Sequence, residues 1–307
     1  MTKFIIKNIF FILPALICTG VPADLFPEIS NSSSISMNFT TQKEIKAVYE
    51  HSSKIHFLNK PGSLFESNGL EINVSAGLSP ISAGIGLEAV FTPIAFIELS
   101  AGAESGSGWN LKIARGLAIN KPDGLTGNRF ENKTFGGIVH REKAGAAFQI
   151  DTGAVIPGDW THIILRTYHE FYHKALTCAG DDQSWLWEAD GGDNRNGYHY
   201  YIQNVIGYKI PSKLSFIGFM MEAERSYYKE DIFPRNGENL WQYIISGIVN
   251  FSINEKIELS VLTQIRTINN YTPETGGYDY YRQRIIDSGK PRKWEFYRVI
   301  ASADYKF

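Results

Sequence analysis

The sequence predicts an all-β fold: a transmembrane antiparallel up-and-down β-barrel of about 12 strands, with 10 strands as the alternative. Long stretches alternate between apolar and polar side chains, which is the period of a β-strand. The clearest runs are about 13 to 16 residues long, whereas strands of globular proteins centre near about five or six. The connections between these runs are short at one end and long at the other, as in strands that cross a membrane in alternate directions.

The composition agrees with a chain rich in strands and turns. The 307 residues include 28 Gly and 12 Pro, 13% are aromatic, and only 20% are charged. A formal net charge of −2 gives no electrostatic reason to expect a nucleic-acid partner. One of the two cysteines lies in the leader described next, so the mature chain keeps Cys178 alone and cannot form an internal disulfide.

Residues 1–23 have the features of a cleaved signal peptide. Lys3 and Lys7 precede a short apolar core, and Ala23 is a small residue suited to the cleavage site. The apolar core is too short to cross a bilayer comfortably. Cys18 leaves a lipoprotein alternative, which the bulky Ile17 before it disfavours. The sequence therefore predicts an exported protein.

Residues 24–68 show no sustained pattern. Residues 31–34 are rich in serine and suggest a loop, and a break at residues 60–63 separates a short apolar stretch from the rest. We expect an N-terminal arm that is periplasmic or associated with the lumen, with additional barrel strands as the remaining alternative. The barrel is accordingly assigned to residues 69–307.

From residue 70 the alternation is clear. Three runs, residues 70–78, 81–91 and 95–103, place Leu, Ile, Val and Ala on one face and Glu, Ser and Gly on the other. Residues 109–119 are the expected eleventh strand, although Arg115 falls on its apolar face, and a return strand within residues 130–140 would be the twelfth. Without this pair the barrel has ten strands.

The second half of the chain supplies seven further runs: residues 144–156, 160–175, 197–210, 213–228, 240–252, 256–271 and 294–307. Short turns are expected near residues 157–159, 211–212 and 253–255, and long loops at residues 176–196, 229–239 and 272–293. This parity places the end of the chain on the short-turn side, which is the periplasmic side of such barrels. Aromatic residues near strand ends are expected to form girdles at the membrane boundary: Trp109, Trp160, Tyr208, Trp241 and Tyr305.

The last strand alternates up to the final residue. One face carries Tyr297, Val299, Ala301, Ala303, Tyr305 and Phe307. The pattern, with its terminal aromatic residue, resembles the C-terminal assembly signal of bacterial outer-membrane β-barrel proteins, and its candidate residues are Tyr297, Val299, Tyr305 and Phe307. The resemblance implies the outer membrane of a diderm bacterium, contact with its lipid, and assembly by the barrel-insertion machinery and periplasmic chaperones.

The opposite face of the strands is rich in charge. The lumen-facing candidates are Glu88, Glu98, Arg166, Glu170, Glu222, Glu224, Arg266, Arg298 and Asp304. Acids outnumber bases on this face, which predicts an acidic lumen: either an ion-pair network that packs a narrow barrel or a small cation-preferring passage. The expected function is a narrow channel or transporter for small solutes or ions. A surface-exposed structural or ligand- and host-binding barrel that acts through its long loops is the alternative.

Two short motifs raise the third-ranked function, an outer-membrane hydrolase. His169 to His173 spell the H-E-x-x-H pattern of zinc proteases, but that chemistry needs a helix, and four residues of a strand span roughly 13 Å. His51 and Ser53 have the H-x-S spacing of outer-membrane phospholipases, and acidic residues near His199 are faintly similar to those of omptin proteases. We assign no catalytic residue, metal ligand or cofactor.

Overall fold

The computed structural model describes residues 29–42, 44–57, 68–121, 130–181, 183–188, 192–228, 237–278 and 283–307. The predicted signal peptide lies outside these residues. Among the residues that are described, no helix is long and apolar enough to span a bilayer.

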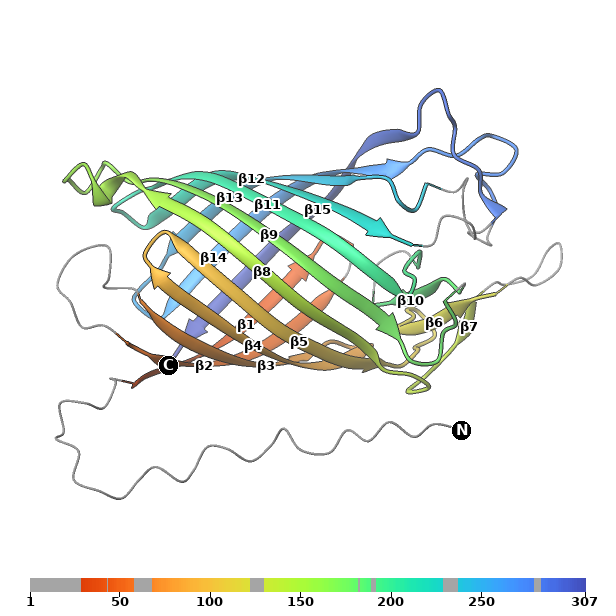
Figure 1. Cartoon of the computed structure of the whole chain (residues 1–307), viewed down its shortest axis with the longest axis horizontal. Helices are drawn as coiled ribbons and strands as arrows, with labels where there is room; N and C mark the ends of the chain where they lie inside the picture. The colour runs from red at the N-terminus through yellow and green to blue at the C-terminus, as the bar shows by residue number, and fades with distance from the viewer. Residues whose placement is uncertain are drawn as a thin grey trace, which may run out of the picture.

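The described strands form a closed antiparallel barrel of twelve, which confirms the predicted fold class and strand number (Figure 1). In chain order they are β1 (Ile29–Thr40), β2 (Ile45–Ile55), β3 (Gly69–Leu78), β4 (Ser82–Ile94), β5 (Ile97–Gly108), β8 (Val139–Asp151), β9 (Ile163–Leu176), β11 (Gly197–Lys209), β12 (Leu214–Tyr227), β13 (Gln242–Ser252), β14 (Ile257–Asn269) and β15 (Arg292–Lys306). Each pairs with the next, and β1 pairs with β15 to close the barrel.

The two ends of the barrel differ in their connections. We call the end at which β15 finishes the turn end and the opposite end the loop end. The connections 95–96, 152–162, 210–213 and 253–256 lie at the turn end, and 109–138, 177–196, 228–241 and 270–291 lie at the loop end. The short turn predicted at residues 157–159 is wrong, because β8 ends at Asp151 and β9 begins only at Ile163. The predicted alternation fails in the first four strands, because residues 41–44 and 79–81 make short turns at the loop end. The long connections of the loop end therefore join only strands from β5 onward.

Two barrel strands come from the segment predicted to be an arm. The prediction of an arm separate from the barrel is wrong for β1 and β2, and the barrel begins at or before Ile29 rather than at residue 69. The sequence of β1 was predicted to be partly a loop because serine occurs on both faces of the strand. Its outer face still carries Ile35, Met37 and Phe39, which are 40–49% exposed, as expected for side chains that meet lipid.

The segments predicted as the eleventh and twelfth strands lie outside the barrel. β6 (Leu117–Asn120) and β7 (Phe130–Asn132) pair with each other, and β6 also pairs with β10 (Trp185–Trp187). Three apolar residues of this small sheet, Leu117, Ile119 and Trp185, are buried in one cluster with Val139 of β8 and Leu176 of β9. The apolar pattern of residues 117–119 thus serves a local core and not a lipid-facing strand.

The inner and outer faces of the barrel are fixed by contacts between strands that are not neighbours. Arg166 of β9 contacts Glu98 of β5 although β8 lies between these strands, so both side chains point inward. Large apolar side chains on the opposite face, such as Leu87, Phe148 and Phe219, are 46–66% exposed. An apolar outer face around a charged interior is the arrangement of an outer-membrane β-barrel.

Candidate functional site in the barrel lumen

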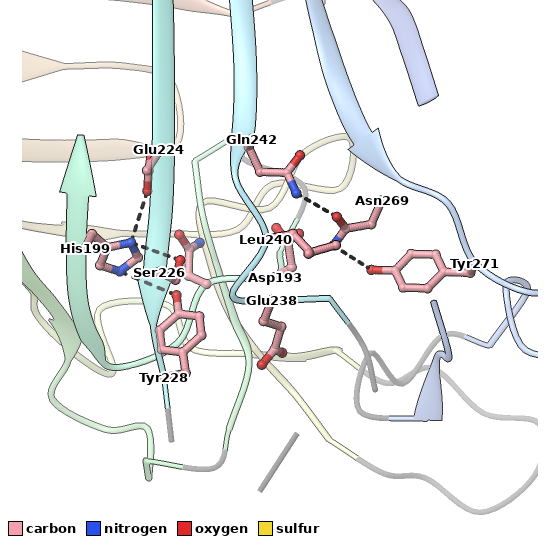
Figure 2. A pocket seen from close by; sticks show the side chains of 11 residues that line it. Asp193, His199, Glu224, Ser226, Tyr228, Glu238, Leu240, Gln242, Asn269 and Tyr271 are labelled. Atoms are coloured by element: carbon pink, nitrogen blue, oxygen red, sulfur yellow. Dashed lines mark hydrogen bonds and ion pairs between the residues drawn. The ribbon is translucent and has the colours of Figure 1, made fainter. Parts of the chain in front are cut away.

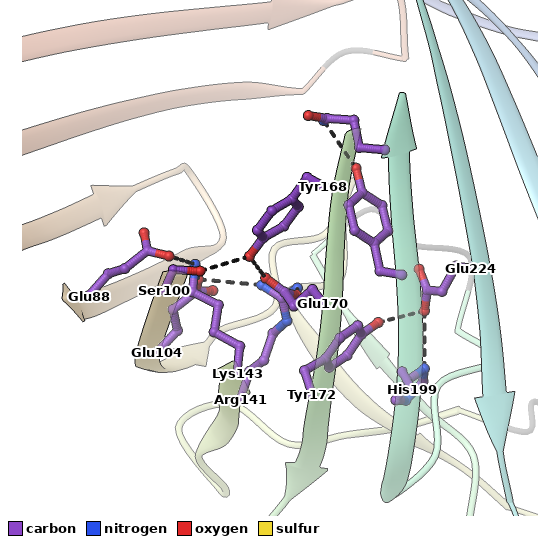
Figure 3. Close-up of polar contacts among 12 residues, drawn as sticks. Glu88, Ser100, Glu104, Arg141, Lys143, Tyr168, Glu170, Tyr172, His199 and Glu224 are labelled. Carbon is purple, nitrogen blue, oxygen red and sulfur yellow. Dashed lines mark hydrogen bonds and ion pairs between the residues drawn. The ribbon is translucent and has the colours of Figure 1, made fainter. Parts of the chain in front are cut away.

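A dense cluster of charged side chains lines the lumen side of the consecutive strands β4, β5, β8 and β9 (Figure 3). The Nζ atom of Lys143 lies 3.1 Å from a carboxylate oxygen of Glu88 and 3.3 Å from one of Glu104. The guanidinium group of Arg166 donates to Glu98 at 3.0 Å. The structure thus brings Glu88 and Glu98, both predicted to face the lumen, next to bases that lie two strands away.

Glu170 lies at the centre of this cluster and is 3% exposed. Its carboxylate accepts hydrogen bonds from Arg141 and, at 2.6 Å, from the hydroxyl of Tyr168. The guanidinium group of Arg141 also lies 4.2 Å from the ring centroid of Tyr172. Because a buried carboxylate is stable only when its oxygens are hydrogen-bonded, these contacts keep a charged pair inside the barrel.

The sequence-based prediction missed two basic residues of this cluster, Arg141 and Lys143. The predicted strand began at residue 144, whereas β8 starts at Val139 and directs Arg141 and Lys143 inward. These residues alternate with His140 and Glu142 on the outer face, so the segment has no apolar face to signal a strand. The lumen along β8 and β9 is consequently closer to charge balance than the predicted excess of acids.

Glu222 and Glu224 of β12 face the lumen in the predicted phase. Glu222 accepts a hydrogen bond from the Tyr201 hydroxyl at 2.7 Å. Glu224 accepts one from Tyr172 at 2.5 Å and lies 3.0 Å from Nδ1 of His199. Tyrosine hydroxyls and an imidazole hold these two carboxylates, in contrast to the Lys and Arg contacts of Glu88 and Glu170.

The remaining lumen-facing candidates lie on β14 and β15. Arg266 donates to Glu295 at 2.9 Å, and Arg298 donates to Gln264 and to Glu44, each at 2.9 Å. Asp304 accepts a hydrogen bond from Ser36 across the closing pair of strands. These contacts join the last strand to both of its neighbours.

The predicted alternation of the last strand is interrupted at Tyr297. The register between β14 and β15 shifts here, because Gln264 pairs with Arg298 and Ile265 pairs with Phe296. The ring of Tyr297 lies 4.1 Å from the guanidinium carbon of Arg266, a lumen residue, so Tyr297 points inward. A β-bulge leaves one extra residue unpaired and turns its side chain, so the outward alternation begins at Val299.

The connection between β9 and β11 reaches across the mouth of the barrel. Glu188, near its middle, accepts hydrogen bonds from Lys46 of β2 at 2.8 Å and from Ser82 of β4 at 2.7 Å. Neighbouring Trp187 lies against Gly106 of β5, where a β-carbon would come within 3.0 Å of the indole ring. Glycine at residue 106 therefore permits this close approach, and the connection narrows the loop end.

Three cavities whose linings include charged side chains lie along the lumen. A cavity of about 480 Å³ lies beneath Glu188, and a second of about 280 Å³ lies between Glu98 and Tyr201. A third, of about 160 Å³, lies at the loop end near Glu224 and Tyr228 (Figure 2). Tyr228 is buried, and this burial raises the pKa of its hydroxyl above the ordinary value, so that Tyr228 stays neutral at physiological pH.

The hydrolase motifs do not assemble as catalytic sites. His169 and His173 point outward from β9, while Glu170 between them points into the lumen, so the three cannot share one metal ion. His51 of β2 lies between Ser33 at 2.9 Å and Ser53 at 3.3 Å. The Ser53 hydroxyl donates its proton to Asn31 at 2.8 Å, so it does not donate to His51 as an activated serine nucleophile would.

No family model matches this chain, and no curated protein does. Among solved structures it is similar to the KdgM porin, with 10% identity over 89% of this chain and 99% of that chain, at a TM-score of 0.41. It is also similar to the NanC porin, with 7% identity over 89% and 98% of the two chains, at a TM-score of 0.40. OmpT of Vibrio cholerae matches with 8% identity over 91% and 97%, at a TM-score of 0.38. The assignment of a barrel rests on the strand pairing described above.

Proposed function

We propose that this barrel is a narrow outer-membrane channel for small solutes or ions. The observation that carries the proposal is the series of cavities, lined in part by charged side chains, inside a closed barrel whose outer face is apolar. Charged side chains inside a barrel of this size need hydration as well as partners, and the same water provides a path for small polar molecules. Residues 1–23 and the terminal Phe307 would supply export and recognition by the insertion machinery.

Side chains and one connection limit the width of this path. The side chains around Glu170 project into the lumen from β8 and β9, and the contact of Glu188 with Lys46 crosses the loop end. A twelve-stranded barrel has little free interior even before these contacts are counted. We therefore propose passage of ions and small solutes and exclusion of larger ones.

The lumen along β12 supports a preference for cations. The carboxyl groups of Glu222 and Glu224 are contacted by neutral tyrosine hydroxyls and by the imidazole of His199. Carboxylates in a narrow passage with low-dielectric walls concentrate cations and repel anions. We therefore replace the predicted acidic lumen with a local acidic stripe along β12, beside the more balanced cluster on β8 and β9.

Recordings from the purified protein in a planar bilayer test this proposal. We expect stepwise conductance and, in a salt gradient, a reversal potential of cationic sign. Glu222→Gln should shift that potential toward zero, and Glu188→Gln, which weakens the contact with Lys46, should raise the conductance. Glu131→Gln on β7, outside the barrel, is the matched control for both. Barrels that fold correctly but stay silent would exclude the channel.

A binding role at the cell surface is the second candidate. Besides its long connections, the loop end carries the sheet of β6, β7 and β10, which has its own apolar core around Trp185. A sheet with its own buried core can present side chains to a ligand in fixed positions. A silent barrel with this sheet intact would favour the binding role.

A further inference from the structure

Three side chains with metal-binding groups converge on the outer face of the barrel at its loop end. His140 and Glu142 occupy alternate positions of β8, and His173 of β9 is the register partner of Glu142. The two oxygens of Glu142 face different imidazoles: one lies 3.9 Å from Nε2 of His140 and the other 3.3 Å from Nδ1 of His173. The potential ligand atoms all lie within 4.8 Å of one another.

We propose that His140, Glu142 and His173 form a binding site for a divalent transition-metal ion, with zinc as the reference ion. Two imidazole nitrogens and one carboxylate oxygen are a ligand set that zinc commonly takes, whereas magnesium and calcium prefer oxygen ligands alone. Bonds of about 2.0–2.2 Å in a tetrahedron place ligand atoms roughly 3.3 Å apart. The contact between Glu142 and His173 already has this separation.

Small movements bring the third ligand into place. The side chains of His140, Glu142 and His173 are 30%, 56% and 34% exposed, so all three reach solvent and have room to move on that side. Their backbone is fixed by the paired strands β8 and β9, which holds the three residues together while the side chains adjust. Three protein ligands leave a fourth tetrahedral position open to water.

The site lies where the strands leave the apolar band. The next outward pairs toward the turn end are Ala144 with Phe171, Ala146 with His169, and Phe148 with Thr167. We therefore place these three polar side chains at the boundary between lipid and water. An ion bound there would be in contact with solvent. It is separate from the lumen and does not depend on the proposed channel function.

Of the two histidines in the H-E-x-x-H motif, only His173 belongs to the proposed zinc site. His173 meets ligands from the neighbouring strand, whereas His169, also on the outer face of β9, contacts the Tyr200 hydroxyl at 2.8 Å. Cross-strand partners lie closer than residues four apart on one strand, which is why β8 supplies the missing ligands. His169 therefore serves as a matched control.

Calorimetric titration of zinc into the purified barrel in detergent tests the site. The protein carries no histidine tag, and Cys178→Ser removes a thiol near the loop end that could bind zinc. We expect about one ion per barrel, with affinity lowered by at least about tenfold in His140→Ala and His173→Ala, and unchanged in His169→Ala. Cobalt should give the visible absorption of a tetrahedral site, which the same two variants should lose.

Heat-modifiable migration of every variant on gels confirms that the barrel remains folded, so a loss of binding cannot be attributed to unfolding. Glu142→Gln should weaken zinc binding and keep the barrel intact. The proposal is overturned if the parent protein binds no more zinc than a variant lacking both His140 and His173. An equal loss in His169→Ala would overturn it as well.

Discussion

Met221→Arg tests directly which face of β12 meets lipid. Met221 lies near the middle of the fourteen residues of this strand and is 40% exposed on the outer face. Its register partners are Asn204 on β11 and Ile245 on β13. An arginine at this position would put its charge into the hydrocarbon region of the membrane.

The expected cost follows from this depth. An arginine on the lipid face of a barrel costs about 2–4 kcal/mol at the midplane and about 0–1 kcal/mol near the interfaces. We expect the upper range for Met221→Arg and a smaller cost for Ile217→Arg, closer to the turn end. Glu222→Gln on the inner face should cost no more than about 1 kcal/mol, because an amide oxygen can still accept the hydrogen bond from Tyr201.

Reversible unfolding by urea in lipid vesicles, followed by tryptophan fluorescence, measures these free energies. The order of destabilisation should be Met221→Arg, then Ile217→Arg, then Glu222→Gln. If Glu222→Gln were the most damaging change and Met221→Arg harmless, the inner and outer faces of β12 would have been assigned the wrong way round. The acidic stripe and the cation preference derived from it would then be abandoned.

Three further predictions concern assembly, orientation and the lumen cluster. Deleting Phe307 should leave export intact but deplete the protein from the outer membrane; normal abundance with normal heat-modifiable migration would count against the assembly signal. Ser288→Cys, in a protein lacking Cys178, should react with an impermeant thiol reagent on whole cells, and labelling only after membrane rupture would invert the proposed orientation. Glu170→Gln should lower the free energy of unfolding by about 3 kcal/mol, since Arg141 loses its buried carboxylate partner; a change below about 0.5 kcal/mol would show that the pair contributes little.

The strands that alternate cleanly could be predicted from the sequence. The alternation along β12 predicted opposite faces for Met221 and Glu222, as in the structure, because a lipid-facing side and a charged side differ sharply in polarity. The same rule failed where a strand lacks an apolar face. β8 near Arg141 carries His140 and Glu142 outside, and β1 carries serine on both faces.

Other features depend on contacts between distant parts of the chain. The pattern around Tyr297 contains no sign of the bulge, which arises from the register between β14 and β15. Nothing in residues 177–196 indicates that Glu188 meets Lys46, about 142 positions away in sequence. The grouping of His140, Glu142 and His173 could likewise not be predicted from the sequence, because it depends on the register between β8 and β9.

The closing pair of strands has a consequence for the order of folding. Ser36 and Asp304, which join β1 to β15, are separated by 268 positions. Every other neighbouring pair of strands is closer in sequence, so the sheet can grow by successive hairpins while its first edge stays unpaired. An exposed edge can pair with another chain, and here it persists until the last strand has been synthesised and exported. Serine and asparagine fill much of the first half of β1, which makes that part of the unpaired edge polar and lowers its tendency to aggregate in water before the barrel closes.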